Sequence, residues 1–336
     1  MRKLSLLLIG FLFIPLLFLT SCDRGDDILD GTTATPSFSL MKDYMVSNSL
    51  DINNIIAGPG DVVKFVAGAP LESDLANFLE KYYIVDIRNS DDYANGHIQG
   101  AVNVAFEDII TAAPNAGSKP ILLVCYTGQT ACYGTALLRM YGYSYTQALK
   151  WGMSGWNPTT AGSWNNAITE NPADGHANWS YLEAPPNDTF LDPTITSIST
   201  QGLDILKSRV EQVVEDGFMA VVGVDVLTSP NDYFVNNYFS DVDYEDFGHL
   251  ANAYRIKEEL LLVGNGYQAL NPDPSAKVVS YCYTGQTSAV LTAWLRVLGY
   301  DAYSLTFGMN GLYNSNDAWV TNKWTAAVSG NLPLVN

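Results

Sequence analysis

Short apolar runs alternate with amphipathic segments along most of this chain. Ile121–Val124 is a continuous apolar run, which is typical of a strand buried on both faces, and Val278–Tyr281 is its counterpart further along. Tyr83–Ile87 and Ala220–Val226 are further apolar runs and predict two more strands. Because helical segments separate these runs, the pattern predicts an α/β fold with a mostly parallel sheet covered by helices on both faces.

Each central run is followed by a loop and an amphipathic helix. Apolar residues recur on one face of each helix: Tyr133, Ala136, Leu137, Met140 and Tyr141 in the first, and Val290, Ala293, Trp294, Val297 and Leu298 in the second. Gly142 and Gly299 are predicted to end these helices. Two further helices are predicted over 74–81, with Ser73 as N-cap, and over 203–215.

An internal repeat divides the chain. Residues 125–130 and 282–287 both read Cys-Tyr-Thr-Gly-Gln-Thr, and matches at the same offset continue through the following helix. A six-residue identity inside a longer aligned block indicates a duplication, and a length of 336 residues favours two domains. We therefore predict domains over 43–184 and 200–336, joined by a linker over 185–199 that contains the turn-forming Pro185-Pro186.

The first residues have the layout of an export signal. Arg2 and Lys3 precede an apolar stretch that ends in Leu19-Thr20-Ser21-Cys22, which predicts a signal peptide over 1–21. The sequence at Cys22 resembles the lipobox of bacterial lipoproteins, which implies a lipid on that cysteine; the alternative is an ordinary signal peptide with a chance cysteine. Residues 22–42 then predict a flexible tether. The protein would be exported and anchored by lipid to a bacterial membrane, facing the periplasm or the cell surface.

The charge balance narrows the range of partners. The chain has 35 acidic and 17 basic residues and a formal net charge of -18. This excess repels phosphates and anionic headgroups, so we expect no nucleic acid partner and no membrane contact beyond the lipid anchor. With Cys22 assigned to lipid, the three remaining cysteines cannot all pair within one chain, so at least one thiol is predicted to be free or reactive.

A cysteine between a buried strand and a helix can hold an anion. The loop is expected to point backbone N–H groups at Cys125 and at Cys282, where the start of the helix adds partial positive charge. Such a nest stabilises a thiolate or persulfide and is expected to lower the pKa of the cysteine. Glycine at the fourth position permits a tight loop, and threonine hydroxyls and glutamine amides are expected to line its rim. The loop residues are Tyr126, Thr127, Gly128, Gln129 and Thr130 in the first copy, and Tyr283, Thr284, Gly285, Gln286 and Thr287 in the second.

These loops resemble the active-site loop of the rhodanese family, which begins with cysteine and has glycine at its fourth position. In the first copy, Asp86-Ile87-Arg88 and the Gly-His-Ile-Gln-Gly-Ala-Val-Asn segment at 96–103 are similar to the family's other motif. Residues 149–156 resemble its closing segment, with Trp151 in place of the first glycine. The resemblance implies two rhodanese-like domains with Cys125 and Cys282 as catalytic residues.

The same resemblance implies the reaction. Sulfane sulfur would pass through a cysteine persulfide, from thiosulfate or a persulfide to a thiol, cyanide or sulfite. The substrate would thus be a small sulfur-containing anion or thiol, and no metal or organic cofactor is implied. The alternative is a non-catalytic, membrane-tethered module that carries or senses sulfur or docks a partner protein.

Supporting roles are implied for Asp86, Arg88 and His97 in the first copy and for Asp225 and His249 in the second. In the second copy, Asp225 is aligned with Asp86, so that Leu227 replaces Arg88 and an acidic insertion over 241–246 precedes His249. In the family this arginine supports the active loop, so activity is predicted more firmly for the first site. The inserted acids could hold calcium, but they lack an EF-hand pattern and predict a solvated loop.

Three further alternatives concern single features. A six-residue loop without arginine lacks a phosphate clamp, which argues against phosphatase or arsenate reductase activity. Cys132 is predicted to be a small core residue, and the alternative is a resolving thiol that attacks a persulfide on Cys125. His97 and His249 are predicted to bond to backbone in turns rather than to act in catalysis.

Overall fold

The computed structural model describes residues 36–336. The predicted signal peptide, Cys22 and most of the predicted tether lie outside the described residues. Within 36–336, every helix is too short or too polar to cross a membrane. Helix α1 (Ser37–Ser47) begins inside the region predicted as tether, so the prediction that the tether reaches residue 42 is wrong.

The first half of the described chain contains a parallel five-stranded sheet with the order β1-β5-β4-β2-β3. Its strands are β1 (Val66–Ala67), β2 (Tyr83–Asp86), β3 (Val102–Asn103), β4 (Ile121–Val124) and β5 (Gln147–Leu149). Strand β4 is buried on both faces, as its continuous apolar run predicts. Ile121 and Leu123 pack with α5 (Ile109–Ala112) and α6 (Gln129–Tyr141), whereas Leu122 and Val124 pack with α3 (Leu75–Lys81) and α7 (Met153–Trp156). The short helices α4 (Ser90–Ala94) and α8 (Gly162–Ala167) complete this half.

The second half contains a parallel four-stranded sheet with the order β7-β11-β10-β8. Its strands are β7 (Ala220–Val221), β8 (Phe234–Asn237), β10 (Val278–Tyr281) and β11 (Ala302–Leu305), and a separate antiparallel pair joins β6 (Trp179–Ser180) to β9 (His249–Leu250). Helices α9 (Gly202–Asp216) and α12 (Gln286–Leu298) cover one face, and α10 (Gly223–Thr228), α11 (Asp241–Phe247) and α13 (Gly308–Tyr313) cover the other. The predicted fold class is confirmed in both halves.

Two local predictions are wrong. Only the first two residues of Ala220–Val226 form a strand, because the chain turns at Val222 into helix α10. Ser73 does not cap α3, since it lies within a turn of 3₁₀ helix that precedes it.

The strand register shows which elements of the two halves correspond. Strand β7 pairs with β11 at the sheet edge, as β1 pairs with β5. Strand β8 pairs with β10, as β2 pairs with β4. Asn237 is therefore the counterpart of Asp86, and the alignment that gave this place to Asp225 is wrong.

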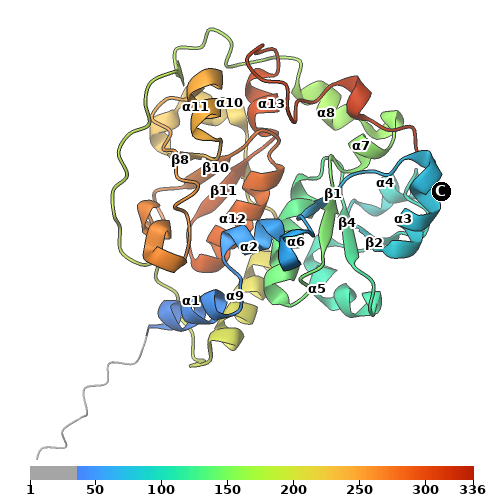
Figure 1. Ribbon diagram of the computed structural model, residues 1–336, viewed down its shortest axis with the longest axis horizontal. Coiled ribbons are helices and arrows are strands. Elements are labelled where there is room, and N and C mark those ends of the chain that lie inside the picture. The colour runs from blue at the N-terminus through green and yellow to red at the C-terminus, as the bar shows by residue number, and fades with distance from the viewer. Residues whose placement is uncertain (1–35) are drawn as a thin grey trace, which may run out of the picture. The chain divides into compact units, whose positions relative to one another are not determined.

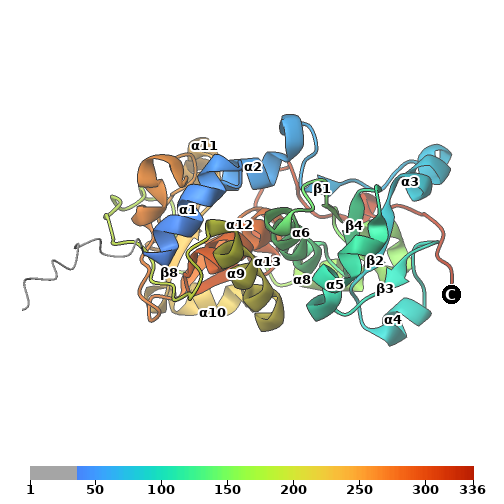
Figure 2. The same cartoon turned by 90° about the horizontal axis from the view of Figure 1, so that it is seen from below.

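The two central helices, α6 and α12, pack against each other, so that one hydrophobic core crosses between the halves (Figures 1 and 2). Tyr133 and Leu137 from α6 and Trp294 from α12 are buried in this core. The helices end where predicted, at Gly142 and Gly299, whose φ angles of +130° and +103° suit glycine. We call the contact between α6 and α12, with the loops that precede them, the seam.

Both ends of the described chain cross the seam. Helices α1 and α2 (Ile52–Ala57) come before the first sheet but pack on α9 and α12, and Trp294 Nε1 donates to Leu50 O at 3.2 Å. The last residues return to the first half, where Val335 pairs with His97 and Trp156 Nε1 donates to Pro333 O at 2.9 Å. Figures 1 and 2 both show the chain end beside α4 and the first sheet. Each half is thus fastened to the other by its own terminal segment.

Asp51 is the polar anchor of the N-terminal crossing. Its carboxylate is 4 % exposed and accepts hydrogen bonds from the amides of Ile52, Leu262 and Val263 at 2.8, 2.9 and 3.2 Å. We predict that Asp51→Ala lowers the free energy of unfolding by about 2 kcal/mol, because it leaves buried amides without acceptors. Urea denaturation followed by tryptophan fluorescence measures this, with Asp43→Ala on the exposed side of α1 as control. An equal effect of both substitutions would show that Asp51 is not an anchor.

Candidate active site

Cys125 is the first residue after β4, and its sulfur lies inside the bend of the loop that leads into α6. The amides of Gly128 and Ala131 donate to Cys125 Sγ at 3.1 and 3.3 Å. Gly128 has a φ of +85°, which permits this bend. Two amides of the predicted nest therefore face the sulfur.

The surroundings of Cys125 oppose a negative charge. The residue is 3 % exposed, and burial raises the pKa of its thiol above the ordinary value. Amide donors from Ala131, Thr127 and Gly128 act in the opposite direction but are outweighed. The prediction that the nest lowers this pKa is therefore wrong, because it considered the amide donors and not the desolvation of the thiolate.

Cys282 has the corresponding place after β10 but different neighbours. The amide of Ser288 donates to Cys282 Sγ at 3.3 Å, and Ser288 Oγ lies 3.7 Å from the sulfur and 2.9 Å from Ser304 Oγ. The offset of the repeat and the strand register place Ala131 and Ala148 at these two positions in the first half. The second sulfur, which is 1 % exposed, thus lies beside a pair of hydroxyls that the first site lacks.

The tyrosine after each cysteine connects the loop to a neighbouring helix. Tyr126 Oη donates to Asp92 at 2.5 Å and accepts from Asn89 Nδ2 at 2.8 Å, and Tyr283 Oη donates to Asp243 in the second half. The bond from Tyr126 lowers the pKa of Asp92, while burial and this carboxylate raise the pKa of Tyr126 to about 12. Tyr126 is therefore a neutral donor near neutral pH.

The acidic residues over 241–246 belong to α11, which is the counterpart of α4. Both helices are capped by the side chain that precedes them, Asn89 for α4 and Ser240 for α11. Asp241 pairs with Arg255 at 2.9 Å, and Asp243 accepts from Tyr283. The predicted insertion and loop are therefore wrong, because the spacing was counted from Asp225 instead of from Asn237, whereas Asp241, Glu245 and Asp246 are exposed to solvent as predicted.

Asp86 and Arg88 form a buried ion pair beside the first loop. Arg88 Nη2 lies 2.7 Å from Asp86 Oδ2 and also donates to Gly96 O at 2.8 Å. The guanidinium lies over the ring of Tyr126, 5.8 Å from its centroid. Arg88 therefore connects β2, the turn before His97 and the tyrosine of the loop, which gives it the supporting position that the resemblance implies.

A neutral pair has the same place in the second half. Asn237 Nδ2 donates to Tyr281 Oη at 2.7 Å, and Asn237 Oδ1 accepts from the amide of Phe239 at 2.7 Å. The ring of Phe239 stacks on Tyr283 with 4.6 Å between centroids. Phe239, and not Leu227, therefore replaces Arg88, and an aromatic ring supports the second loop where a guanidinium supports the first.

The two histidines stabilise turns. His97 Nδ1 lies 3.0 Å from Tyr93 O, and its ring stacks on that tyrosine at 3.8 Å. His249 makes contacts of 2.9 and 2.8 Å with the carbonyl oxygens of Leu250 and Leu182, and burial lowers its pKa. The prediction that both histidines bond to backbone is confirmed.

The two cysteine loops touch across the seam through their glutamines. Gln129 Oε1 accepts from the amide of Phe307 at 2.7 Å, and Gln286 Nε2 donates to Thr127 O at 3.3 Å. These amides were predicted to line two separate rims, whereas each reaches the opposite half. The identity of the two loops was the available signal, because it places a matching side chain on both sides of the seam.

Cys132 lies in the first turns of α6 and is fully buried. Burial, together with the charges of Cys125 and Cys282, raises the pKa of its thiol well above the ordinary value. All three cysteines in the described part of the chain are free thiols. The core position agrees with the leading prediction, and a role as resolving thiol stays a prediction.

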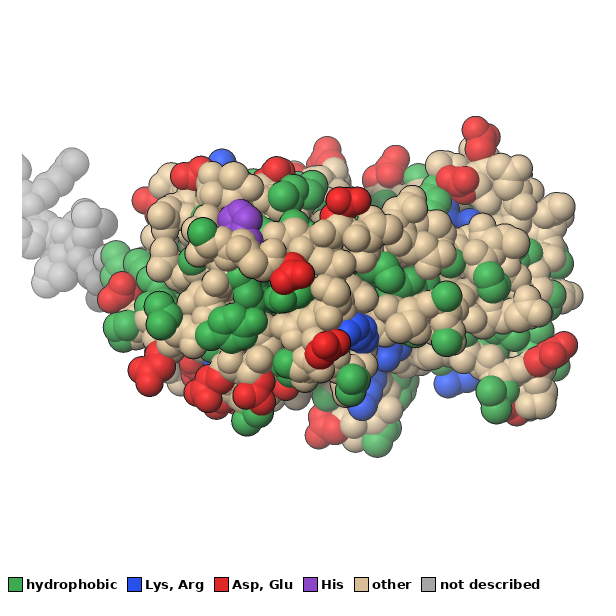
Figure 3. All heavy atoms as spheres, turned by 90° about the horizontal axis from the view of Figure 1, so that it is seen from above, with side chains coloured by type: hydrophobic (Ala, Val, Ile, Leu, Met, Phe, Trp, Pro, Cys, Tyr) green, Lys and Arg blue, Asp and Glu red, His purple; other side chains and the backbone are tan. Residues whose placement is uncertain are grey.

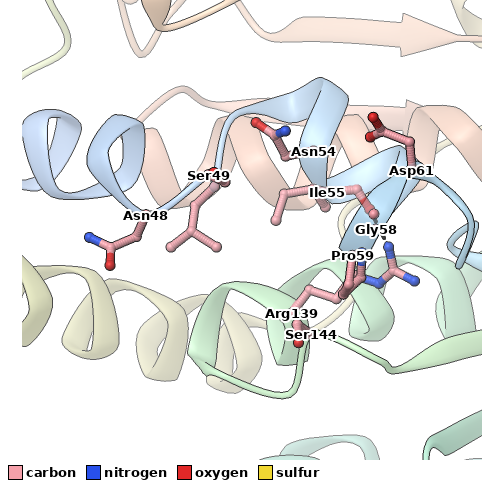
Figure 4. A pocket seen from close by; sticks show the side chains of 11 residues that line it. Asn48, Ser49, Asn54, Ile55, Gly58, Pro59, Asp61, Arg139 and Ser144 are labelled. Atoms are coloured by element: carbon pink, nitrogen blue, oxygen red, sulfur yellow. Dashed lines mark hydrogen bonds between the residues drawn. The ribbon is translucent and has the colours of Figure 1, made fainter.

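A surface hollow of about 400 Å³ lies between the α2 region and the end of α6, away from both cysteine loops (Figure 4). Arg139 reaches from α6 towards Gly58 and Pro59 at this hollow, and it donates to the carbonyl oxygens of Ile55 and Val63 at 2.7 and 2.8 Å. Burial lowers the pKa of Arg139 to about 10. The hollow thus surrounds an arginine that fastens the N-terminal segment to α6.

Comparison with known proteins identifies the family. The family model described as "Rhodanese-like domain" matches residues 71–159 and 224–315, which together make up more than half of the chain. Each match contains one cysteine loop. The chain therefore belongs to the rhodanese-like domain family and carries two such domains in tandem.

Individual relatives are sulfurtransferases. Thiosulfate sulfurtransferase GlpE of Pseudomonas entomophila is 34 % identical over 92 residues, which cover 27 % of this chain and 84 % of the relative. The GlpE protein of Shewanella oneidensis is 33 % identical over 79 residues, covering 23 % and 78 %. Each relative thus matches about one domain of this chain.

Solved structures give weaker matches. Thiosulfate sulfurtransferase from Pseudomonas aeruginosa covers 89 % of this chain and 49 % of its own, with 16 % identity and a TM-score of 0.29. 3-Mercaptopyruvate sulfurtransferase from Leishmania major covers 74 % of this chain and 75 % of its own, with 15 % identity and a TM-score of 0.27. The family assignment does not depend on these two matches.

The ion pair at the first loop generates a stability prediction. Arg88→Met leaves the Asp86 carboxylate buried without a counter-charge, which should lower the free energy of unfolding by about 3–5 kcal/mol. The double variant Asp86→Asn/Arg88→Phe copies Asn237 and Phe239, so we expect it to recover most of that loss. Urea denaturation at neutral pH compares the two proteins. A double variant as unstable as Arg88→Met would be evidence against this equivalence.

The buried thiol of Cys132 should make the fold sensitive to alkaline pH. Its pKa is raised in the folded state, so its contribution to stability is complete below the unfolded value of about 8.5 and is lost as pH rises through the folded value. Cys132→Ala copies Ala289 of the second domain. Between neutral pH and about pH 10, we predict that this variant loses less unfolding free energy than wild type in urea titrations. Parallel losses would refute the prediction.

Proposed function

We propose that this protein is a sulfurtransferase that carries sulfane sulfur on Cys125 and, with lower activity, on Cys282. The observation that supports this most directly is the position of Cys125 Sγ at the start of α6, where two backbone amides donate to it. Backbone donors at this place favour the thiolate that attacks the donor and an anionic persulfide on the same residue. The thiosulfate sulfurtransferases among the relatives support the choice of reaction.

The proposed reaction needs no oxidant and no cofactor. The Cys125 thiolate attacks the outer sulfur of a donor such as thiosulfate, the donor S–S bond breaks, and sulfite leaves with the bonding electron pair. The persulfide Cys125-S-S⁻ is then attacked at its outer sulfur by an acceptor thiol, cyanide or sulfite. Cys125 leaves as the thiolate, and the amides of Gly128 and Ala131 would stabilise the negative charge at each stage.

Loop length favours sulfur over phosphate as the transferred group. The loop from Cys125 to Thr130 has six residues and contains no arginine. Phosphate recognition would need a guanidinium that donates two parallel hydrogen bonds. Arg88, the nearby arginine, is already bonded to Asp86 and Gly96.

The two sites are proposed to differ in activity. Cys125 accepts two amide hydrogen bonds, whereas Cys282 accepts one and lies beside the hydroxyl of Ser288. A weaker nest stabilises a persulfide less well, so we assign most of the turnover to Cys125.

We further propose that the protein works outside the cytoplasm, on a bacterial membrane, held by a lipid on Cys22. The sequence around that cysteine supports this placement. Acidic side chains are spread over the face shown in Figure 3, and basic ones are few. An acidic surface repels nucleic acid phosphates, which supports the proposal that nucleic acids are not partners.

A second candidate function is favoured by the burial of both sulfurs. At 3 % and 1 % exposure, Cys125 and Cys282 could hold sulfane sulfur without turning it over. The protein would then be a tethered carrier, sensor or docking module.

Cysteine substitutions separate the two functions. In a thiosulfate–cyanide assay, we predict that Cys125→Ser lowers kcat/KM by about 10³-fold or more, because the nucleophile is lost, and that Cys282→Ser lowers it by less than about tenfold. The double variant should be inactive, and Cys132→Ala should retain wild-type turnover.

Intact mass after incubation with thiosulfate provides the second readout. A gain of about 32 Da, one sulfur atom, is expected on wild type and not on the double variant. A wild type that gains this mass but shows no turnover with thiosulfate or glutathione persulfide would favour the carrier over the enzyme. Turnover that persists in the double variant would reject both functions.

A further inference from the structure

Two aromatic residues have the same unfavourable backbone conformation at equivalent places in the two domains. Trp151 and Phe307 each precede a Gly-Met pair, after β5 and β11 respectively, and have φ angles of +68° and +61°. This left-handed region is strained for a bulky residue and persists only when the surroundings enforce it. Glycine would form the same turn without strain, so the conformation points to a use for the two rings.

The two rings belong to one aromatic cluster at the seam. The ring centroids of Trp151 and Phe307 each lie 4.9 Å from that of Trp164. The ring centroid of Trp324 lies 5.3 Å from that of Trp164 and 5.4 Å from that of Trp151. Trp164 and Trp324 are fully buried. We call these four residues the ring cluster; two of them come from each domain.

The turns that carry Trp151 and Phe307 lie directly against the two cysteine loops, and the ring of Trp164 contacts the first loop. Trp164 Nε1 donates to Thr127 O at 3.1 Å, in the first loop. A Cβ atom at Gly128 would lie 3.0 Å from Trp151 N, and one at Gly285 would lie 2.9 Å from Phe307 N. These glycines are the fourth residues of the two loops, so the turns that carry the rings leave no space above them.

We propose that the ring cluster is one gate shared by both cysteine sites, and that Trp151 and Phe307 are the residues that hold it closed. This inference rests on the proposed function, since it assigns the gate to the access of sulfur donors and acceptors. While the rings are in contact, water is excluded from both sulfurs, which protects a bound persulfide. Reagents reach Cys125 and Cys282 only when the rings separate.

The contacts within the ring cluster couple the two sites. Trp164 touches Trp151 in its own domain and Phe307 in the other, so removal of either ring loosens the packing above both loops. The amide of Phe307 also donates to Gln129 of the opposite loop. A movement of the rings that exposes one cysteine therefore also exposes the other.

Alkylation rates test the gate without any sulfur transfer. The purified full chain is treated with iodoacetamide, and the modification of Cys125 and Cys282 is followed separately by peptide mass. Trp151→Gly should raise both rates by about tenfold, because it removes two ring contacts and tolerates the left-handed turn. Phe307→Gly should do the same at both cysteines, whereas Trp151→Phe keeps a ring and should stay within about twofold of wild type.

A control separates loss of the ring from relief of backbone strain. Asn252 also has a left-handed φ of +60° but bonds to Asn231 and does not belong to the ring cluster, so Asn252→Gly should leave both rates unchanged. Unchanged alkylation rates in Trp151→Gly would overturn the gate. A faster rate at Cys125 alone would show that the two sites do not share one gate. If the ring variants are alkylated faster but the wild type transfers no sulfur, the gate is supported and the proposed function is rejected. If the wild type transfers sulfur but the ring variants are alkylated at the wild-type rate, the proposed function is supported and the gate is rejected.

Discussion

The packing of α6 against α12 is the constraint on which the rest of this structure depends. Each helix begins at a cysteine loop, so packing the two helices with their starts together brings both loops to one seam. Gln129 and Gln286 then bond across it, and the ring cluster covers it. The terminal segments, which cross to the opposite domain, oppose separation of the two halves. The two domains of the tandem repeat thus form one unit in which the sulfurs of Cys125 and Cys282 are buried.

Burial creates an electrostatic conflict at the first site. The amides of Gly128 and Ala131 favour an anion on Cys125, whereas burial raises the pKa of the same thiol. Separation of the rings in the proposed gate would resolve this conflict, because water would then reduce the cost of the charge while the amides remain in place. Different residues support the cysteine loop in the two domains. The Asp86–Arg88 ion pair supports the first loop, and Asn237 with Phe239 supports the second.

The sequence predicted those features that depend on local pattern. Strands β4 and β10 and their helices were predictable, because a short continuous apolar run suits a buried strand and a regular apolar face suits a helix packed on a sheet. The counterpart of Asp86 was not, since Ala220–Val226 is as apolar as a true strand and only pairing with β10 reveals β8. The loop-to-loop glutamine bonds, the ring cluster and the raised pKa of Cys125 were also missed, because each arises from contacts between residues of the two domains or from burial that the loop sequence does not reveal.

The central claim is that the first cysteine loop holds a sulfur atom on Cys125 through its backbone amides. A crystal structure of the protein after incubation with thiosulfate tests this most directly. The account predicts an extra sulfur bonded to Cys125 Sγ, within hydrogen-bonding distance of the amides of Gly128 or Ala131. An unmodified Cys125 in crystals whose sulfur-loaded mass had been verified, or a persulfide that points away from these amides, would contradict it.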